Sequence, residues 1–189
     1  EIYENEVKYN TATNGAGFYV LSSSPDIHDN TPVSNNVASN KGGGFYWDNS
    51  EGDLEEPNFY YNEANYGGGI YLEKKSPAFS NTSIDNNVAL YDGGGAYLEG
   101  VDGPYGITHT GLESNDAVNG NGGGIYIDGG DPFIFANTVE YNTAVNGGGI
   151  AIENSSEAEI NDNDIDHNEA DGNGGGVICN SSDATIHYN

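Results

Sequence analysis

The sequence contains no arginine and no methionine, a single cysteine and only four lysines. Because Cys179 has no second cysteine to pair with, an internal disulfide is excluded. Against the four lysines stand 30 acidic residues, which gives a formal net charge of −26. A surface of this charge repels nucleic acid and anionic lipid, so neither is an expected partner.

Long hydrophobic runs are also missing. No stretch of 18 apolar residues occurs, so we expect no direct insertion into a membrane. The acidic composition suits an extracellular or cell-surface setting, which is the localisation we predict. The lack of methionine indicates that the chain is processed or is a piece of something longer.

Glycine is abundant, and it recurs in a regular pattern along the sequence. A triple glycine followed by a short apolar run begins at Gly42, Gly67, Gly93, Gly122, Gly147 and Gly174, and a variant, Gly-Ala-Gly, begins at Gly15. The third glycines follow one another at 27, 25, 26, 29, 25 and 27 residues. A repeat in this range is typical of a solenoid.

A second pattern, apolar-x-x-Asn-x-Ala, precedes each glycine triplet. Its asparagine is present in all seven copies: Asn10, Asn36, Asn62, Asn87, Asn115, Asn142 and Asn168. Stacked amides at a bend can hydrogen-bond along the column and satisfy the backbone groups that the bend leaves open. We therefore predict a structural asparagine ladder and assign these residues no ligand.

The runs between turn residues alternate apolar and polar positions, as Ile125-Tyr126-Ile127 does, which is the period of a strand with one buried face. These features predict an all-β fold: a right-handed parallel β-helix of about seven coils of about 26 residues, forming one domain over residues 1–189. A leucine-rich repeat is the nearest alternative, since residues 160–170 echo its consensus. However, the fourth position of that consensus, which is a leucine there, is Asn, Thr or Pro here.

The chain begins with Ile2-x-x-Asn5 and stops with Ile186-x-x-Asn189, at the same phase of the coil. Neither end carries a polar cap, although the terminal coils of a solenoid need one to cover their strand edges. We therefore expect uncapped ends, and either a segment of a longer solenoid or the subunit of a filament that stacks end to end or laterally.

These two motifs together resemble a known family. The pairing of Gly-Gly-Gly-Ile with Ile-x-x-Asn is similar to the Gly-Gly-Ala-(Ile/Leu/Val) and Phe-x-x-Asn repeats of chlamydial-type polymorphic outer membrane proteins. This chain has Gly where that family prefers Ala, and Ile or Val where it prefers Phe. The resemblance implies a secreted or surface-displayed adhesin or structural stalk whose partners are surface glycans or proteins.

One position of the strand after the glycines stands out as the candidate binding surface. It is tyrosine in five successive coils, namely Tyr19, Tyr46, Tyr71, Tyr97 and Tyr126, and the flanking positions are apolar. The tyrosines should therefore point away from the core, about 4.8 Å apart. Two interpretations remain open: a side-chain ladder partly covered by neighbouring turns, or an exposed strip that docks sugar rings or a neighbouring rod.

An enzyme is the alternative, because polysaccharide lyases and hydrolases also use β-helices. A lyase of this kind needs a cationic base, and the chain has no arginine. The spacing from each third glycine to the next apolar column is 10 to 12 residues, which leaves no long loop to wall a cleft. We predict a non-catalytic structural or adhesive protein, with polysaccharide binding or degradation as the alternative.

Further residues of chemical interest fall in turns. The densest acidic turn contains Asp48, Glu51, Asp53, Glu55 and Glu56. These carboxylates are the candidate ligands of a weak Ca²⁺ site, although the chain requires no cofactor. Three Asn-x-Ser/Thr sequons, at Asn81, Asn154 and Asn180, are candidates for glycosylation. The four histidines share no ligand spacing. Cys179 falls in the inward column with Trp47 and Ile152 and is expected to be buried.

Overall fold

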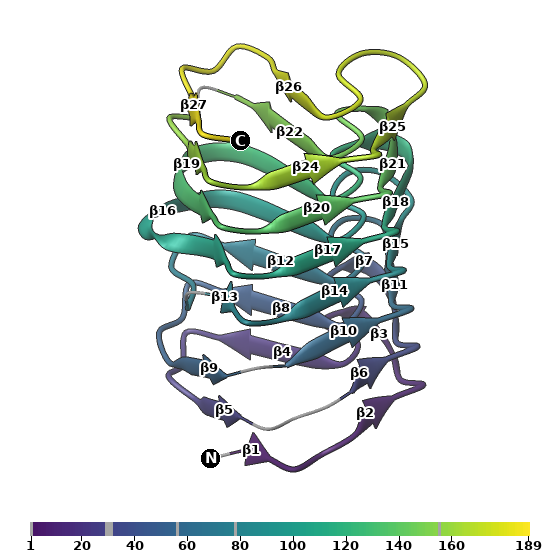
Figure 1. Ribbon diagram of the computed structural model, residues 1–189. Helices are drawn as coiled ribbons and strands as arrows, with labels where there is room; N and C mark the ends of the chain where they lie inside the picture. The colour runs from purple at the N-terminus through teal and green to yellow at the C-terminus, as the bar shows by residue number, and fades with distance from the viewer. Residues whose placement is uncertain (1, 29–31, 56, 78, 155) are drawn as a thin grey trace.

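The computed structural model describes residues 2–28, 32–55, 57–77, 79–154 and 156–189. The chain winds into a rod of stacked coils, with the first coil at one end and the last at the other (Figure 1). Every strand pairing among these residues is parallel, and each strand pairs with its counterpart one coil away. None of the described segments is a helix that could span a membrane. The predicted parallel β-helix is confirmed.

The strands form four faces, each running along the rod. Sheet 1 contains β1 (Ile2–Tyr3), β5 (Asp26–His28) and β9 (Asp53–Glu55). The same face continues through β13 (Phe79–Ser80), β23 (Glu159–Asn161) and β27 (Thr185–His187). These three are connected by two long strands, β16 (Ala96–Thr108) and β19 (Ile125–Phe135), which turn the corner from sheet 4 into sheet 1.

Sheets 2 to 4 complete the coil. Sheet 2 contains β2 (Val7–Lys8), β6 (Val33–Ser34), β10 (Asn58–Tyr60), β14 (Ser83–Asp85), β17 (Gly111–Glu113), β20 (Thr138–Glu140) and β24 (Asp164–Asp166). Sheet 3 contains β3 (Thr11–Asn14), β7 (Val37–Lys41), β11 (Glu63–Ala64), β15 (Val88–Ala89), β18 (Asp116–Asn121), β21 (Thr143–Asn146) and β25 (Glu169–Ala170). Sheet 4 contains β4 (Phe18–Leu21), β8 (Phe45–Asp48), β12 (Ile70–Glu73), β22 (Ile150–Glu153), β26 (Val177–Cys179) and the first halves of β16 and β19.

The apolar columns of the sequence fill the inside of the rod. Phe59, Ile84 and Leu112 follow one another in register on sheet 2 and are fully buried. Phe45 and Trp47 enter the same core from sheet 4, and the indole N–H of Trp47 donates to the backbone oxygen of Ser50 at 2.7 Å. Because every coil contributes to one continuous core, no single coil can bury its apolar face alone.

The glycine triplets are required by both conformation and space. Gly67 has a φ of +63°, a conformation that side chains disfavour. A Cβ on Gly68 would lie 2.5 Å from the backbone oxygens of both Gly94 and Val88. The triplet therefore marks the bend between sheets 3 and 4, where neighbouring coils approach too closely for a side chain at Gly68.

The asparagine ladder predicted from the sequence is present. Asn62 donates from its backbone N and its Nδ2 to Oδ1 of Asn87, at 2.9 and 3.0 Å. Asn87 in turn donates from Nδ2 to Oδ1 of Asn115 at 3.1 Å and to the backbone oxygen of Phe59 at 3.0 Å. The same links join the remaining rungs, which are Asn10, Asn36, Asn142 and Asn168. The ladder closes the bend between sheets 2 and 3.

A second, shorter ladder closes the bend between sheets 1 and 2. Asn137 donates from N and Nδ2 to Oδ1 of Asn163, and Asn163 repeats this toward Asn189. The residue before each of these asparagines is in the left-handed conformation, as at Asp162, with a φ of 54°. These two bends therefore use one device, in which an amide replaces the backbone partners that the turn removes.

Candidate functional site: the tyrosine column and an acidic pocket

The tyrosines of sheet 4 form one continuous column of ring contacts on the outer side of that sheet. Tyr46, Tyr71, Tyr97 and Tyr126 are register partners in successive coils. The ring centroids of Tyr71 and Tyr97 lie 4.5 Å apart in a stacked arrangement, and those of Tyr97 and Tyr126 lie 4.8 Å apart. Tyr19 stacks on the ring of Tyr46 at 4.9 Å. This column is separate from the core inside the rod.

Of the two interpretations that the sequence left open, the exposed docking strip does not fit four of the five tyrosines. Tyr46, Tyr71, Tyr97 and Tyr126 are only 2 to 7% exposed, whereas Tyr19 is 48% exposed. The structure matches the other interpretation, a ladder covered by neighbouring turns.

The cover comes from the residues just before the glycine triplets, and long loops are not needed. Tyr66, which precedes Gly67, packs with its edge against the ring of Tyr97 at 5.9 Å. Lys41, which precedes Gly42, places its Nζ 4.4 Å from the ring centroid of Tyr71. Even spacing between coils therefore does not indicate an open sheet face.

Each buried phenol is paired with a carboxylate of the next coil. The hydroxyl of Tyr46 donates to Glu73 at 2.7 Å, and the hydroxyl of Tyr97 donates to Asp128 at 2.8 Å. The same link joins two further pairs, Tyr71 with Glu99 and Tyr126 with Glu153. The geometry follows from the sequence, since an acidic residue stands two positions after each of these tyrosines, on the same side of the strand.

These phenols are held in their protonated form. Burial raises the pKa of Tyr71, and the hydrogen bond to Glu99 raises it further. Burial likewise raises the pKa of Tyr97, with a smaller contribution from the bond to Asp128. The hydroxyls therefore act as fixed donors, and the arrangement links one coil to the next.

The carboxylates of sheet 4 follow one another in register and form an acidic column of Asp48, Glu73, Glu99, Asp128 and Glu153. Lys41 neutralises the N-terminal half of this column. Its Nζ lies 3.2 Å from Glu73 and 3.0 Å from Glu99. Burial alone would raise the pKa of Glu73, but hydrogen bonds from Lys74, Tyr46 and Lys41 outweigh it and lower the pKa to about 2. Glu73 is thus a charged anchor for three donors.

The C-terminal half of the column lacks such a counterion, because all four lysines precede residue 76. Asp92 accepts a hydrogen bond from the backbone N–H of Asn121 at 2.8 Å. Burial raises the pKa of Asp92, the Asn121 bond opposes the rise, and the charges of Glu153 and Asp128 add to it. The protein therefore disfavours the ionised form of Asp92, whereas it favours the ionised form of Glu73.

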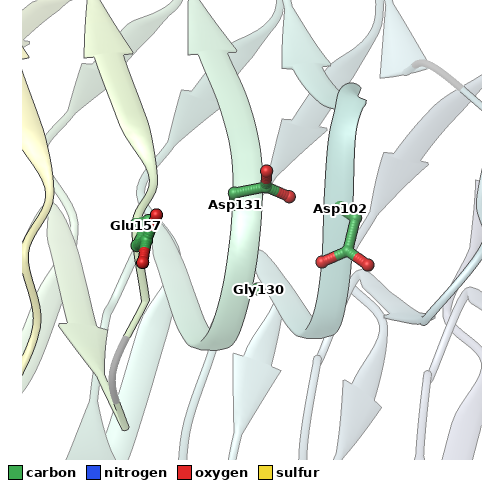
Figure 2. Close-up of a pocket in the computed structure, with 4 residues that line it drawn as sticks. All are labelled: Asp102, Gly130, Asp131 and Glu157. Carbon is green, nitrogen blue, oxygen red and sulfur yellow. The ribbon is translucent and has the colours of Figure 1, made fainter.

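A second candidate site is an open pocket of about 380 Å³ at the corner between sheets 4 and 1. Figure 2 shows its lining residues, Asp102, Gly130, Asp131 and Glu157, on three adjacent coils, with the Asp131 side chain directed toward the strand that carries Asp102. Asp131 accepts from the backbone N–H of Gly103 at 2.8 Å, and Asp102 and Asp131 are register partners. The pocket therefore presents stacked carboxylates to solvent.

Sequence reasoning missed this pocket, although a signal for it exists. The interval from Gly95 to Ile107 is 12 residues, the longest of its kind in the chain. In the structure the extra residues appear as a register shift between Asp102 and Gly106, where β16 bulges away from β19. An irregular spacing thus marks the place where the smooth rod surface is hollowed.

The predicted cation turn is only partly described. Glu51 pairs with Lys75 at 2.8 Å, and Asp48 belongs to the acidic column of sheet 4. Glu56 and the side chains of Asp53 and Glu55 lie outside the described residues. Within the described parts of the chain, no group of three His, Cys, Asp or Glu side chains could hold a metal ion.

The remaining predicted positions lie on the surface. Asn81, Asn154 and Asn180 are exposed, and the Asn154 amide donates to Asp128 at 2.6 Å. The prediction that Cys179 is buried is wrong. It pairs in register with the buried Ile152, but its side chain is exposed, and its Sγ lies 3.4 Å from the backbone oxygen of Ser182.

Comparison with known proteins gives one match. A family profile described as "Right handed beta helix region" matches residues 68–189, which is more than half of the chain. No curated protein and no solved structure matches.

Proposed function

Because this chain belongs to the right-handed β-helix family, we propose that it is a non-catalytic structural or adhesive element of an extracellular surface or fibre. The family includes both adhesive and polysaccharide-active proteins, so membership alone selects neither. The features of this chain itself supply the argument for the structural role.

The observation that carries the proposal is the pairing of the tyrosine column. Tyr46, Tyr97 and their counterparts direct their hydroxyls to carboxylates one coil away and are buried. The amides of the asparagine ladder likewise form their hydrogen bonds with one another along the rod axis. Groups that could bind or react with a ligand are thus used to join coils, which suits a stiff rod.

Charge supports the extracellular setting and the choice of partners. The net charge of −26 disfavours nucleic acid and anionic membranes. The resemblance of the repeats to those of chlamydial-type polymorphic outer membrane proteins favours an adhesin or stalk. In this proposal the partners are surface glycans or proteins, and copies of the rod in a fibre.

The proposal predicts that the purified chain does not cleave polysaccharides. The chain would be incubated with a panel of acidic and neutral polysaccharides while reducing ends and unsaturated products are measured. We expect no release above a buffer control. Sustained product release would contradict the non-catalytic part of the proposal.

A polysaccharide hydrolase is the second candidate, and the pocket in Figure 2 is the observation that favours it. Hydrolysis of a glycosidic bond requires two carboxylates about 5 to 10 Å apart. Asp102 and Asp131 stand opposite each other on neighbouring strands, and Glu157 lines the same pocket. If products are released, Asp131→Asn should abolish the release. Asp166→Asn, an exposed acid on sheet 2, is the matched control.

A further inference from the structure

A groove runs along the outer surface of sheet 3, the column of short strands at the right of Figure 1. Its floor is the alanine column, of which Ala38, Ala64 and Ala117 are at most 7% exposed. Outward side chains on either side of each alanine form its walls. Because alanine is small and points inward, the floor between the two walls remains low.

Two hollows make up this groove, and they meet at Val118. The first, of about 350 Å³, is lined by residues of coils 2 to 5, including Val37, Val88 and Leu90. The second, of about 260 Å³, continues through Thr143 to the coil that carries Glu169 and Asp171. Val118 lines both. The groove therefore extends over six coils, about 24 Å at one strand spacing for each step.

The two halves differ in chemistry. In the first half, Val37, Leu90 and Val118 are 42 to 47% exposed, although burial in a partner would be favourable for such side chains. Glu63 is the one carboxylate among the residues that line it. This half is thus an apolar surface left open to water.

In the second half the walls carry Asp116, Glu169 and Asp171. The hydroxyl of Thr143 donates to Asp116, but no cation among the described residues pairs with any of the three carboxylates. All four lysines of the chain precede residue 76. This half is thus an anionic surface that the protein itself does not neutralise.

We propose that this groove binds an extended segment of a cationic partner protein, in which a few apolar residues adjoin a few lysines or arginines. An extended chain advances about 3.3 Å per residue, so about seven or eight residues fill the groove. The apolar residues would lie over Leu90 and Val118, and the basic residues would face Glu169 and Asp171.

Charge argues against the other occupants. A second copy of the chain also has a net charge of −26, so it would place like charges together in the anionic half. Anionic lipid and nucleic acid are repelled for the same reason. The proposal adds a partner to the adhesive role above, and it rests on that role only for its setting. Binding by the purified chain is measured without reference to location or catalysis.

The test uses two labelled eight-residue peptides of identical composition, four apolar residues and four lysines. The block peptide has its four apolar residues together and its four lysines together, and it is made in both orders, apolar residues first and lysines first. In the second peptide the apolar residues and the lysines alternate. Fluorescence anisotropy at physiological salt should show the block peptide, in one order, binding about tenfold more tightly than the alternating one. Equal binding of both would mean general charge attraction and would overturn the proposal, as would no binding at all.

Variants locate the binding. Leu90→Ser and Val118→Ser alter exposed side chains in the apolar half, and Glu169→Gln with Asp171→Asn alters the anionic half. Each should weaken the block peptide about tenfold while leaving the thermal melt unchanged.

Matched control variants lie on other sheets. Leu21→Ser changes a side chain on sheet 4 that is 51% exposed, and Asp166→Asn changes an exposed acid on sheet 2. Both should retain binding, and loss of binding in either control would overturn the proposal. Concentration-dependent self-association of the wild type that Leu90→Ser abolishes would also overturn it, in favour of a second copy.

Discussion

Tyr71 donates its phenolic hydrogen to Glu99 one coil further along the rod, and its ring is stacked on Tyr97 of that same coil. One side chain therefore joins two coils twice, through a hydrogen bond and through its ring. The bond from the phenol to the carboxylate of the next coil is repeated in four successive coils. The tyrosine column is thus an external pillar that runs parallel to the apolar core.

Removing one hydroxyl from this pillar should destabilise the rod. In Tyr71→Phe the ring stays in place, but Glu99 loses a charge-assisted hydrogen bond, at a cost of about 1.5 to 3 kcal/mol in the free energy of unfolding. Urea unfolding followed by circular dichroism measures the change. Tyr19→Phe, at the half-exposed end of the column, is the control and should change stability by under about 0.5 kcal/mol. Equal stability of the two variants would contradict the pillar.

Asn87→Ala tests the asparagine ladder. The change leaves the backbone N–H of Asn62 and the carbonyl of Phe59 without the partners they now have, inside the rod. Each orphaned group costs about 1 to 3 kcal/mol, so a loss of several kcal/mol is expected. Thermal melting should show a large drop for Asn87→Ala and almost none for Asn119→Ala, an exposed asparagine on sheet 3. A small effect at Asn87 would mean that water replaces the ladder.

Glu73 should contribute stability that depends on pH. Its pKa in the folded protein is about 2, below the ordinary carboxyl value of about 4.5, because three donors outweigh its burial. A depressed pKa gives stability that is complete above the unfolded value and is lost as the pH falls toward the folded value. Glu73→Gln should therefore be less stable than wild type at pH 6, and the gap should close between about pH 4.5 and 2. A gap that does not change over this range would contradict the assignment.

Asp92 should behave in the opposite way. Burial and the charges of Glu153 and Asp128 raise its pKa despite the Asn121 bond, so its ionised form costs stability at neutral pH. Asp92→Asn keeps an oxygen for the Asn121 N–H and removes the charge, so it should raise the melting temperature at pH 7. The gain should vanish in acid, where wild-type Asp92 is protonated. Destabilisation at pH 7 would mean that the charge of Asp92 is needed.

The fold could be predicted because each coil repeats the same few constraints. The glycine triplets, the seven asparagines and the inward apolar columns each occupy one position of the coil, and the structure places them in register. The alternation of Phe45, Tyr46 and Trp47 correctly separates the core side of the strand from its outer side.

What covers the outer side could not be predicted from that alternation. Period two gives the direction of a side chain but does not reveal that Tyr66 and Lys41, from the preceding bend, fold over the tyrosines. The pairing of Tyr97 with Asp128 was readable in principle, because an acid two positions after each tyrosine shares its face. Cys179 shows a related limit, because it shares a register position with the buried Ile152 and is nevertheless exposed.

The location of the native protein tests the central claim most directly. Gold-labelled antibodies raised against the folded chain would be applied to intact, unpermeabilised native material and examined by electron microscopy. We expect label on the outer surface or along extracellular fibres, with short rods or continuous filaments beneath it. Label that appears only after permeabilisation, inside the cell, would contradict a structural or adhesive role at an extracellular surface.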